Sequence, residues 1–245
     1  MENENEEWGR IAPTFDPREI NSESRGVENR LIAHPLVLEW LKKYCKPASN
    51  NSRISVLDFG AGPGAFCKTL AEQGFQVTGM DFSKAMIAIA ESSCPKEIRF
   101  IEGGISSLRQ LDESFHAIAA MMVLQFIPDL HQAIEIFSAK LRPKGIFIFA
   151  VHNPEWAHAL LEEHKKFSNP RQTPDGEMMD FELQPGDIVA NHLRTESFYK
   201  TAFEKHSFAH LETAYPLYTK EFIEKNNPKG PTHVSKFLMM VFLKR

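Results

Sequence analysis

Residues 56–64 read V-L-D-F-G-A-G-P-G and join an apolar run to a glycine-rich turn. A glycine turn between a strand and a helix lets a nucleotide-like ligand approach the backbone and the N-terminus of the helix. Two patterns fit this turn. Gly60, Gly62 and Ala65 satisfy the dinucleotide pattern G-x-G-x-x-[GA], whereas Asp58 followed by the glycines fits a second class of ligand. The turn alone therefore leaves both classes open.

Two residues of this turn favour a cationic ligand without phosphate. Asp58 stands two residues before the first glycine, where its carboxylate would repel a pyrophosphate and attract an ammonium or a sulfonium. Pro63 has no backbone N–H, which weakens a phosphate cradle. Asp81, 17 residues after Gly64, ends the next apolar run and can bind the ribose hydroxyls that both ligand classes carry. We therefore predict S-adenosylmethionine, rather than NAD, as the cofactor.

The rest of the chain alternates between strand and helix patterns. We expect strands at residues 54–59, 75–81, 98–102, 115–124 and 146–152, and helices at 65–73, 83–92 and 128–141. This alternation predicts an α/β fold with a parallel sheet covered by helices on both faces. Further along, we expect helices at 153–168 and 196–205, a loop at 169–190, and strands at 208–215 and 236–244. Residues 1–26 are polar and are expected to form a mobile or loosely packed arm, and Pro35 interrupts a helical pattern at 27–44.

Composition limits the partners. The net charge of −4 gives no basic surface for nucleic acid, and no run approaches the ~20 apolar residues of a membrane span. Three scattered cysteines and an acidic start without a secretory signal indicate reduced thiols and a cytoplasmic protein. Nineteen Phe residues predict an interior built largely of phenyl rings. We therefore expect a small-molecule substrate, with neither nucleic acid nor membrane as partner, whereas the oligomeric state is not indicated.

The sequence resembles the class I S-adenosylmethionine-dependent methyltransferases, in particular the small bacterial group called methyltransferase type 11. Residues 56–64 resemble the family's first motif and V-T-G-M-D-F-S-K-A-M, residues 77–86, its second. M-V-L-Q-F-I-P-D at 122–129 and L-R-P-K-G-I-F-I-F-A-V-H-N-P at 141–154 are similar to the segments around the fourth and fifth strands. The resemblance implies a Rossmann-like, seven-stranded, mostly parallel sheet with an antiparallel last strand. It also implies one methyltransferase domain over 1–245, with an N-terminal arm or helical cap at 1–50, a cofactor-binding core at 51–152 and a substrate-side insertion with closing strands at 153–245.

The resemblance also implies roles for individual residues at the cofactor. The methionine end would be held by Asp58, Gly60, Ala61 and Gly62, the ribose by Asp81, the adenine by Phe82 and Met86, and the amino-acid part by the backbone of Met122 and Val123. Ordinary core packing is the alternative for Phe82 and Met86. Gly104 stands where relatives carry an adenine-binding Asp, so adenine recognition would rest on the backbone of Gly104 and Ile105, on stacking, or on Glu102.

The catalytic candidates are two histidines expected near the carboxyl edge of the sheet, His152 and His192. A histidine can act as a base near neutral pH, although with ten in the chain a structural role is the common one. The tetrad N-P-E-W at 153–156 follows the fifth strand, unlike the N-P-P-[YFW] signature of amino-group methyltransferases, so Pro154 is interpreted as the first residue of a helix. Trp8, Phe15 and Trp156 are candidates for a lid.

The predicted function is therefore transfer of a methyl group from S-adenosylmethionine to a small molecule, with no metal. A non-catalytic adenosyl-ligand-binding protein and an NAD-dependent oxidoreductase are the alternatives.

Overall fold

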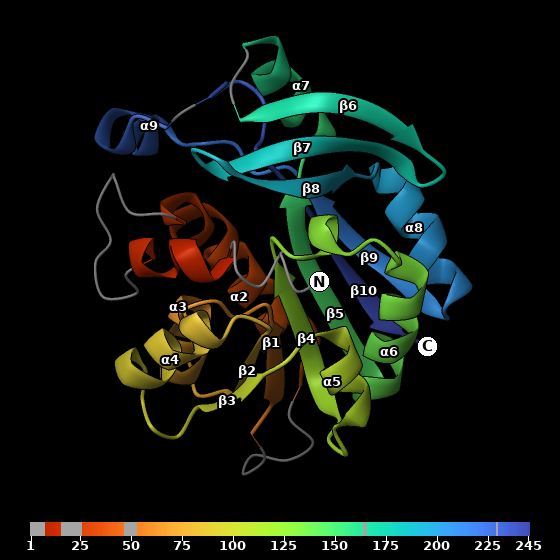
Figure 1. Ribbon diagram of the computed structural model, residues 1–245. Helices are drawn as coiled ribbons and strands as arrows, with labels where there is room; N and C mark the ends of the chain where they lie inside the picture. The colour runs from red at the N-terminus through yellow and green to blue at the C-terminus, as the bar shows by residue number, and fades with distance from the viewer. Residues whose placement is uncertain (1–7, 16–25, 47–52, 164–165, 229) are drawn as a thin grey trace.

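The computed structural model describes residues 8–15, 26–46, 53–163, 166–228 and 230–245. A seven-stranded sheet with the order β3-β2-β1-β4-β5-β10-β9 forms its centre (Figure 1). The strands are β1 Ser55–Phe59, β2 Gln76–Asp81, β3 Arg99–Glu102, β4 Phe115–Met121, β5 Leu141–His152, β9 Phe208–Ala214 and β10 Phe237–Lys244. The pairs among β1 to β5 are parallel, and β10 is antiparallel to both β5 and β9. The predicted fold class is confirmed.

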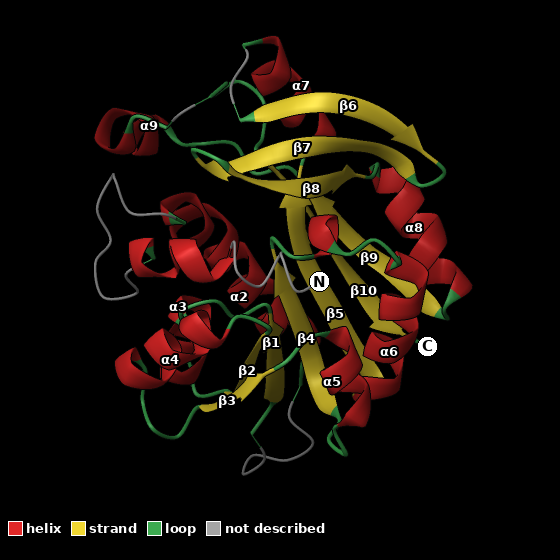
Figure 2. Cartoon of the chain, in the orientation of Figure 1, coloured by secondary structure: helices red, strands yellow, loops and turns green. Residues whose placement is uncertain are grey.

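Helices cover both faces of this sheet (Figure 2). Helices α2 His34–Tyr44 and α3 Ala65–Glu72 pack on one face, and α5 Ile105–Gln110, α6 Leu130–Lys140 and α8 Glu196–Lys205 on the other. The side chains of β5 alternate between the two cores, since Phe147 and Phe149 point to one and Ile146 and Ile148 to the other. A strand that is buried on both faces has a continuous apolar sequence, which is why residues 146–152 could be predicted as a strand.

The core is rich in phenyl rings, as the composition predicts. Phe203 of α8 stacks on Phe242 of β10, with ring centroids 4.3 Å apart and planes 14° apart. Phe137 of α6 contacts Phe147 of β5 at 4.7 Å. Aromatic pairs in these arrangements stabilise a core beyond the area they bury.

Side-chain caps fix where the helices begin. The Ser83 hydroxyl accepts a hydrogen bond from the backbone N–H of Met86 at the start of α4 Lys84–Ser93, as predicted. Asn153 caps α7 Pro154–Glu162 in the same way, and Pro154 occupies the first turn, as expected. These caps place the first turns of α4 and α7 beside the carboxyl ends of β2 and β5.

A second sheet occupies the region predicted to be a loop. Strands β6 Phe167–Thr173, β7 Gly176–Gln184 and β8 Asp187–Leu193 form an antiparallel sheet in that order, which lies above the ends of β4 and β5 in Figure 1. The predictions of a loop at 169–190 and of a helix up to 168 are therefore wrong. The Pro and Gly residues that suggested a loop form the two hairpin turns, P-D-G before β7 and P-G before β8, and Pro170 sits on edge strand β6 where the register shifts.

The N-terminal segments are more ordered than predicted. Residues 8–11 are helical and continue into the 3-10 turn η1 Ala12–Thr14, and Ile11 and Ala12 are completely buried. The expected arm at 1–26 is therefore packed at 8–15, and its remainder, apart from Gly26, lies outside the described residues. Pro35 does not interrupt the next helix, because the π-helix η2 Asn29–Ala33 continues into α2 and Pro35 falls in the first turn of α2.

Two further differences are local. The R-P-K-G stretch lies within the bounds of β5 as an irregular start, where Lys144 has a φ of 60°. The short helices α5 and α9 Lys220–Asn226 were not predicted. No helix among the described residues has the length and apolar content needed to cross a membrane.

Candidate active site

The glycine turn lies at the carboxyl end of β1, between β2 and β4, where the order of the strands reverses. Open α/β sheets bind their ligands at this point. The backbone N–H groups of Gly60 and Ala61 both donate to the carbonyl oxygen of Met80, at 2.7 and 2.9 Å. Gly60 has a φ of 78°, and a Cβ there would stand 2.2 Å from Cγ2 of Val123. Glycine is therefore required at position 60 by both conformation and space.

Asp81, at the end of β2, fixes the turn from the other side. Its carboxylate accepts hydrogen bonds from the backbone N–H of Gly62 at 2.8 Å and of Ser83 at 2.9 Å. Burial raises the pKa of Asp81 to about 6. Gly62 has a φ of 53°, and a Cβ there would meet no atom within 4 Å, so this face of the turn is open. The sequence predicts that Asp81 binds the ribose, but it does not indicate that Asp81 also holds the turn.

Asp58 is almost completely buried, at 1% exposure. Its carboxylate accepts a hydrogen bond from the Cys67 thiol at 3.2 Å. Burial, and to a smaller degree the neighbouring charge of Asp81, raises the pKa of Asp58 to about 7. Two buried carboxyl groups that disfavour each other's negative charge form a site where a cation would be stabilised.

The other predicted cofactor residues surround this turn. Met122, directly after β4, adopts a φ of 60° and donates its backbone N–H to the carbonyl of Ala150 at 2.8 Å. Left-handed backbone at a residue with a side chain is common at functional sites. Gly104 precedes α5, whose first residue is Ile105, and a Cβ at position 104 would meet only Cβ of Phe82, at 3.9 Å.

Phe82 and Met86 have different surroundings. Phe82 is 37% exposed beside Gly104, whereas Met86 is buried in a cluster with Ile11, Ala12, Leu183 and Val189. Phe82 is thus free to stack on a ligand, whereas Met86 also has the core-packing role named as its alternative.

His152 ends β5 in an apolar enclosure. Its ring stacks on Trp156 at 5.5 Å and contacts Phe181 at 5.0 Å. The amide nitrogen of Asn191 in β8 lies 2.8 Å from Nδ1 of His152, which places the ring proton on Nε2. Burial keeps the pKa of His152 well below 6.5, so the ring is neutral at physiological pH.

His192 does not join this group. Side chains of a strand alternate between its faces, and β8 buries Val189, Asn191 and Leu193 while leaving His192 partly exposed. Burial and the nearby Arg194 lower the pKa of His192 to about 4. The structure therefore brings Asn191, which sequence reasoning missed, to His152, and turns His192 to the opposite face of β8.

The 3-10 turn η3 Leu124–Phe126 connects the two sheets. It packs against β8 and β5, and Phe126 contacts the Trp8 ring at 5.3 Å. The guanidinium of Arg194, 1% exposed, donates to the carbonyls of Leu124 at 3.1 Å, Ile127 at 3.0 Å and Pro128 at 2.9 Å. Arg194 therefore holds the backbone of η3 in place.

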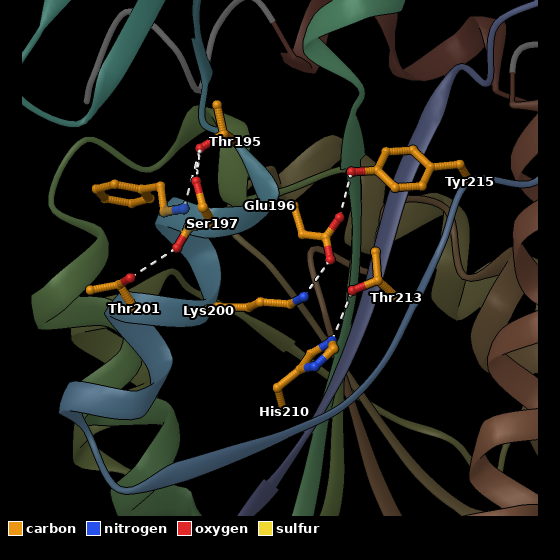
Figure 3. Close-up of polar contacts among 9 residues, drawn as sticks. Thr195, Glu196, Ser197, Lys200, Thr201, His210, Thr213 and Tyr215 are labelled. Atoms are coloured by element: carbon orange, nitrogen blue, oxygen red, sulfur yellow. Dashed lines mark hydrogen bonds and ion pairs between the residues drawn. The ribbon is translucent and has the colours of Figure 1, made fainter.

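A polar cluster next to Arg194 anchors the start of α8 to β9 (Figure 3). Glu196 accepts hydrogen bonds from Lys200 at 2.6 Å and from the Tyr215 hydroxyl at 2.9 Å. Thr213 of β9 lies 2.8 Å from Nε2 of His210, and Thr195 caps α8. These contacts tie the first turn of α8, which follows Arg194 in the chain, to β9 and the residue after it.

Residues 8–15 pack against α4, η3 and the second sheet. Arg10 forms an ion pair with Asp187 at 2.5 Å, and Phe15 joins Trp8 in the cluster around Ile11 and Met86. Trp156, the third aromatic candidate for a lid, instead lies in a separate cluster with Phe167 of β6 and Met179 of β7. The cap segment, defined here as residues 8–15, thus bridges α4, η3 and the second sheet.

A cavity of about 350 Å³ lies among the segments that follow β5 and β9 and that precede β10. Its lining contains none of the predicted site residues and consists of Asn153, Glu155, Tyr215, Leu217, His233, Val234 and Ser235. Among the described residues, no group of three or more His, Cys, Asp and Glu side chains is arranged to hold a metal ion.

The known proteins that this chain resembles in sequence are methyltransferases. A family model described as a methyltransferase domain matches residues 29–213, which is more than half of the chain. A ubiquinone biosynthesis O-methyltransferase of Paramagnetospirillum magneticum is 31% identical over 113 residues, 44% of this chain and 45% of the relative. A demethylmenaquinone methyltransferase of Chlorobaculum parvum is 32% identical over 138 residues, 55% of this chain and 54% of the relative. The chain spans about half the length of the curated relatives it matches.

Solved structures share the fold at low identity. A protein of Pyrococcus horikoshii superimposes with a TM-score of 0.66 at 18% identity, over 98% of this chain and 99% of that one. An S-adenosylmethionine-dependent methyltransferase of Mesorhizobium loti superimposes with a TM-score of 0.61 at 19% identity, over 84% of this chain and 96% of that one.

Proposed function

The chain belongs to the methyltransferase domain family, and we propose that it transfers a methyl group from S-adenosylmethionine to a small-molecule acceptor. The observation that carries this proposal is the pair of buried carboxyl groups, Asp58 and Asp81, on either side of the glycine turn at the strand-order reversal.

The residues at the turn fit this cofactor. Gly62 and Gly104 leave open space where a side chain would stand, so a ligand can approach the backbone there. The Asp58 carboxylate would face the positive methionine end and the Asp81 carboxylate the ribose hydroxyls, with Phe82 beside the adenine. We propose that Ala61, Met122 and Val123 supply backbone contacts and that Met86, Gly104 and Ile105 border the adenine. When bound, the sulfonium supplies a methyl group already activated for displacement.

The chain's own task is to align the acceptor and to exclude water. The cap segment contacts η3 through Trp8 on Phe126 and the second sheet through Arg10 on Asp187, and we propose that these elements close over the edge where Asp58 and Asp81 lie. His152 is neutral and carries its proton on Nε2, so this N–H can donate a hydrogen bond to the methyl acceptor. We propose that His152 orients the acceptor, while His192 remains a candidate that its own variant tests.

The acceptor is proposed to be a small molecule held between the seven-stranded sheet and β6–β8. The residues before 51 and after 152 would form the acceptor side of a single methyltransferase domain, and residues 51–152 the cofactor side. The names of the two curated relatives, a ubiquinone biosynthesis O-methyltransferase and a demethylmenaquinone methyltransferase, support a small organic acceptor. The three cysteines are free and buried, which is consistent with a proposed cytoplasmic location.

Isothermal titration with S-adenosylhomocysteine and with NAD tests the cofactor. We expect the thioether to bind with a Kd in the micromolar range and NAD not to bind. Binding of NAD alone would overturn the proposal in favour of an oxidoreductase. Thioether binding with no methyl transfer to any acceptor in a metabolite panel would instead indicate a non-catalytic binding protein.

A further inference from the structure

Cys67 is a buried thiol in direct contact with one of the two acidic residues at the glycine turn. It lies in the first turn of α3, is 0% exposed, and its Sγ donates to Oδ2 of Asp58 at 3.2 Å. The cluster around Cys67 is apolar and includes Val56 and Leu70. A carboxylate is costly to bury among apolar side chains unless a hydrogen bond or a cation replaces the lost water. The thiol therefore supplies a donor that these apolar neighbours lack.

A glycine makes room for this contact. Gly79 is the residue of β2 that pairs with Asp58 in the sheet. A Cβ at position 79 would stand 2.8 Å from Sγ of Cys67 and 2.6 Å from Cε1 of Phe100, closer than van der Waals contact allows. The backbone of Gly79 is not left-handed, so glycine is required here for space alone. The missing side chain lets α3 bring its thiol against the sheet at the level of Asp58.

The thiol keeps its proton and remains a donor. Burial, and to a smaller degree the charge of Asp58, raises the pKa of Cys67 well above its ordinary value. A thiol is a weak donor, but its hydrogen bond is stronger when the acceptor is ionised.

Three influences act on the ionisation of Asp58. Burial is the largest and raises its pKa, the hydrogen bond from Cys67 lowers it, and the charge of Asp81 raises it to a smaller degree. The thiol of Cys94, directly after α4, also interacts with the charge of Asp58. Of these neighbours, Cys67 is the one that favours the charged carboxylate.

We propose that Cys67 is a positioning residue for the cofactor, whose thiol orients the Asp58 carboxylate and favours its charged form for the ammonium group of the cofactor's amino-acid part; this inference rests on the proposed function. With Oδ2 turned to the thiol, Oδ1 is the oxygen assigned to the ligand. Cys67 itself does not touch the ligand in this arrangement, and its effect on binding passes through Asp58.

The test uses two thioethers that differ at the group that Asp58 is proposed to bind. S-adenosylhomocysteine carries the ammonium, whereas 5′-methylthioadenosine has the adenosine and the thioether but no amino-acid part. Both are titrated by calorimetry into the wild type, Cys67→Ala, Cys67→Ser and Cys45→Ala. Cys45→Ala is the matched control, because it removes another buried thiol, which donates to the carbonyl of His116 at 3.9 Å near the amino end of β4.

At pH 7 we expect Cys67→Ala to weaken S-adenosylhomocysteine by about 5- to 10-fold and to leave 5′-methylthioadenosine within about twofold of the wild type. Cys67→Ser keeps a hydroxyl donor and should recover the affinity for S-adenosylhomocysteine to within about threefold. Cys45→Ala should bind both thioethers like the wild type.

The pH profile separates positioning from packing. The pKa of Asp58 is about 7 in the wild type, so at pH 8.5 the carboxylate ionises with less need of the thiol. The deficit of Cys67→Ala for S-adenosylhomocysteine should therefore shrink to about twofold at pH 8.5. The profile of 5′-methylthioadenosine, which has no ammonium, reports the titration of Asp81 by itself.

Cys67→Val, which fills the space without a donor, replaces Cys67→Ala if the alanine variant does not fold. Unchanged affinity for S-adenosylhomocysteine, an equal loss for both thioethers, no recovery in Cys67→Ser, or the same deficit at pH 7 and pH 8.5 would each overturn the inference. If the wild type bound neither thioether, the proposed function would have failed instead.

Discussion

The carboxylate of Asp81 accepts a hydrogen bond from the backbone N–H of Gly62 at 2.8 Å, so one acidic side chain holds the turn and borders the ligand that the turn is proposed to bind. A second oxygen of the same carboxylate accepts from Ser83. The carboxylate at the end of β2 thereby holds both the turn that follows β1, at Gly62, and the segment that leads into α4, at Ser83.

Asp81→Asn should weaken binding of S-adenosylhomocysteine by about 100-fold, because an amide cannot accept both backbone hydrogen bonds and the turn loses its support. Isothermal titration measures the effect. Asp112→Asn, at an exposed acidic position before β4, is the matched control and should leave the affinity unchanged. Equal affinities for Asp81→Asn and wild type would show that position 81 does not support the site.

The ionisation of Asp58 should make stability depend on pH. Burial raises its pKa from 3.8 to about 7, so the folded protein keeps a proton that the unfolded chain releases. Stability contributed by the protonated carboxyl is fully present below pH 3.8 and is lost as pH rises through about 7, a change on the order of 4 kcal/mol. Urea denaturation from pH 5 to pH 8 should therefore give a falling free energy of unfolding.

Asp58→Asn should reduce the fall in the free energy of unfolding between pH 5 and pH 8. The variant should be more stable than the wild type at pH 8 but should lose affinity for the cationic cofactor. The wild type should bind S-adenosylmethionine more tightly as pH rises from 5 to 8, because binding favours the ionised carboxylate. If Asp58→Asn showed the same pH dependence as the wild type, the titrating group would have to be another one.

Two glycines of the turn should respond differently to the same change. Gly60→Ala places a Cβ 2.2 Å from Val123 at a φ of 78° and should destabilise the fold by about 3 kcal/mol. Gly62→Ala meets no atom within 4 Å and should lower stability by only about 1 kcal/mol, from its positive φ, while impeding the ligand. Urea denaturation and thioether titration of both variants check this contrast, and equal destabilisation by the two would contradict it.

The two histidines should differ in their effect on turnover. His152→Gln should lower kcat/KM by about 10- to 100-fold once an acceptor is known, because it removes the Nε2–H donor of a ring whose Nδ1 lies 2.8 Å from the amide nitrogen of Asn191. His192→Gln, on the opposite face of β8, should stay within about threefold of the wild type. Since the pKa of His152 lies well below 6.5, kcat should show no His152 titration between pH 6 and pH 8. Full turnover in both variants would exclude both histidines.

Local patterns made the cofactor half predictable. The strand Ser55–Phe59, the cap at Ser83 and the helix start at Pro154 each depend on residues within a few positions, and each was found where expected. The continuous apolar runs identified the central strands because these are buried on both faces.

The acceptor half could not be predicted in the same way. Turn residues such as Pro174 and Pro185 indicate a hairpin only if the flanking segments are recognised as strands, and β6 is mostly exposed, so its apolar pattern is weak. Whether His192 or Asn191 lies next to His152 depends on which face of β8 is turned toward β5. That orientation follows from tertiary contacts and cannot be read from the sequence of β8 alone.

The three-stranded sheet is inserted between α7 and α8 and leaves the order of the seven central strands unchanged. Segments of this kind can diverge or be exchanged while the turn at Gly60 and its two acidic residues stay the same. A chimaera that carries the β6–β8 segment of a relative, joined within 163–166 and at Arg194, would therefore redirect the choice of acceptor while keeping the original cofactor affinity.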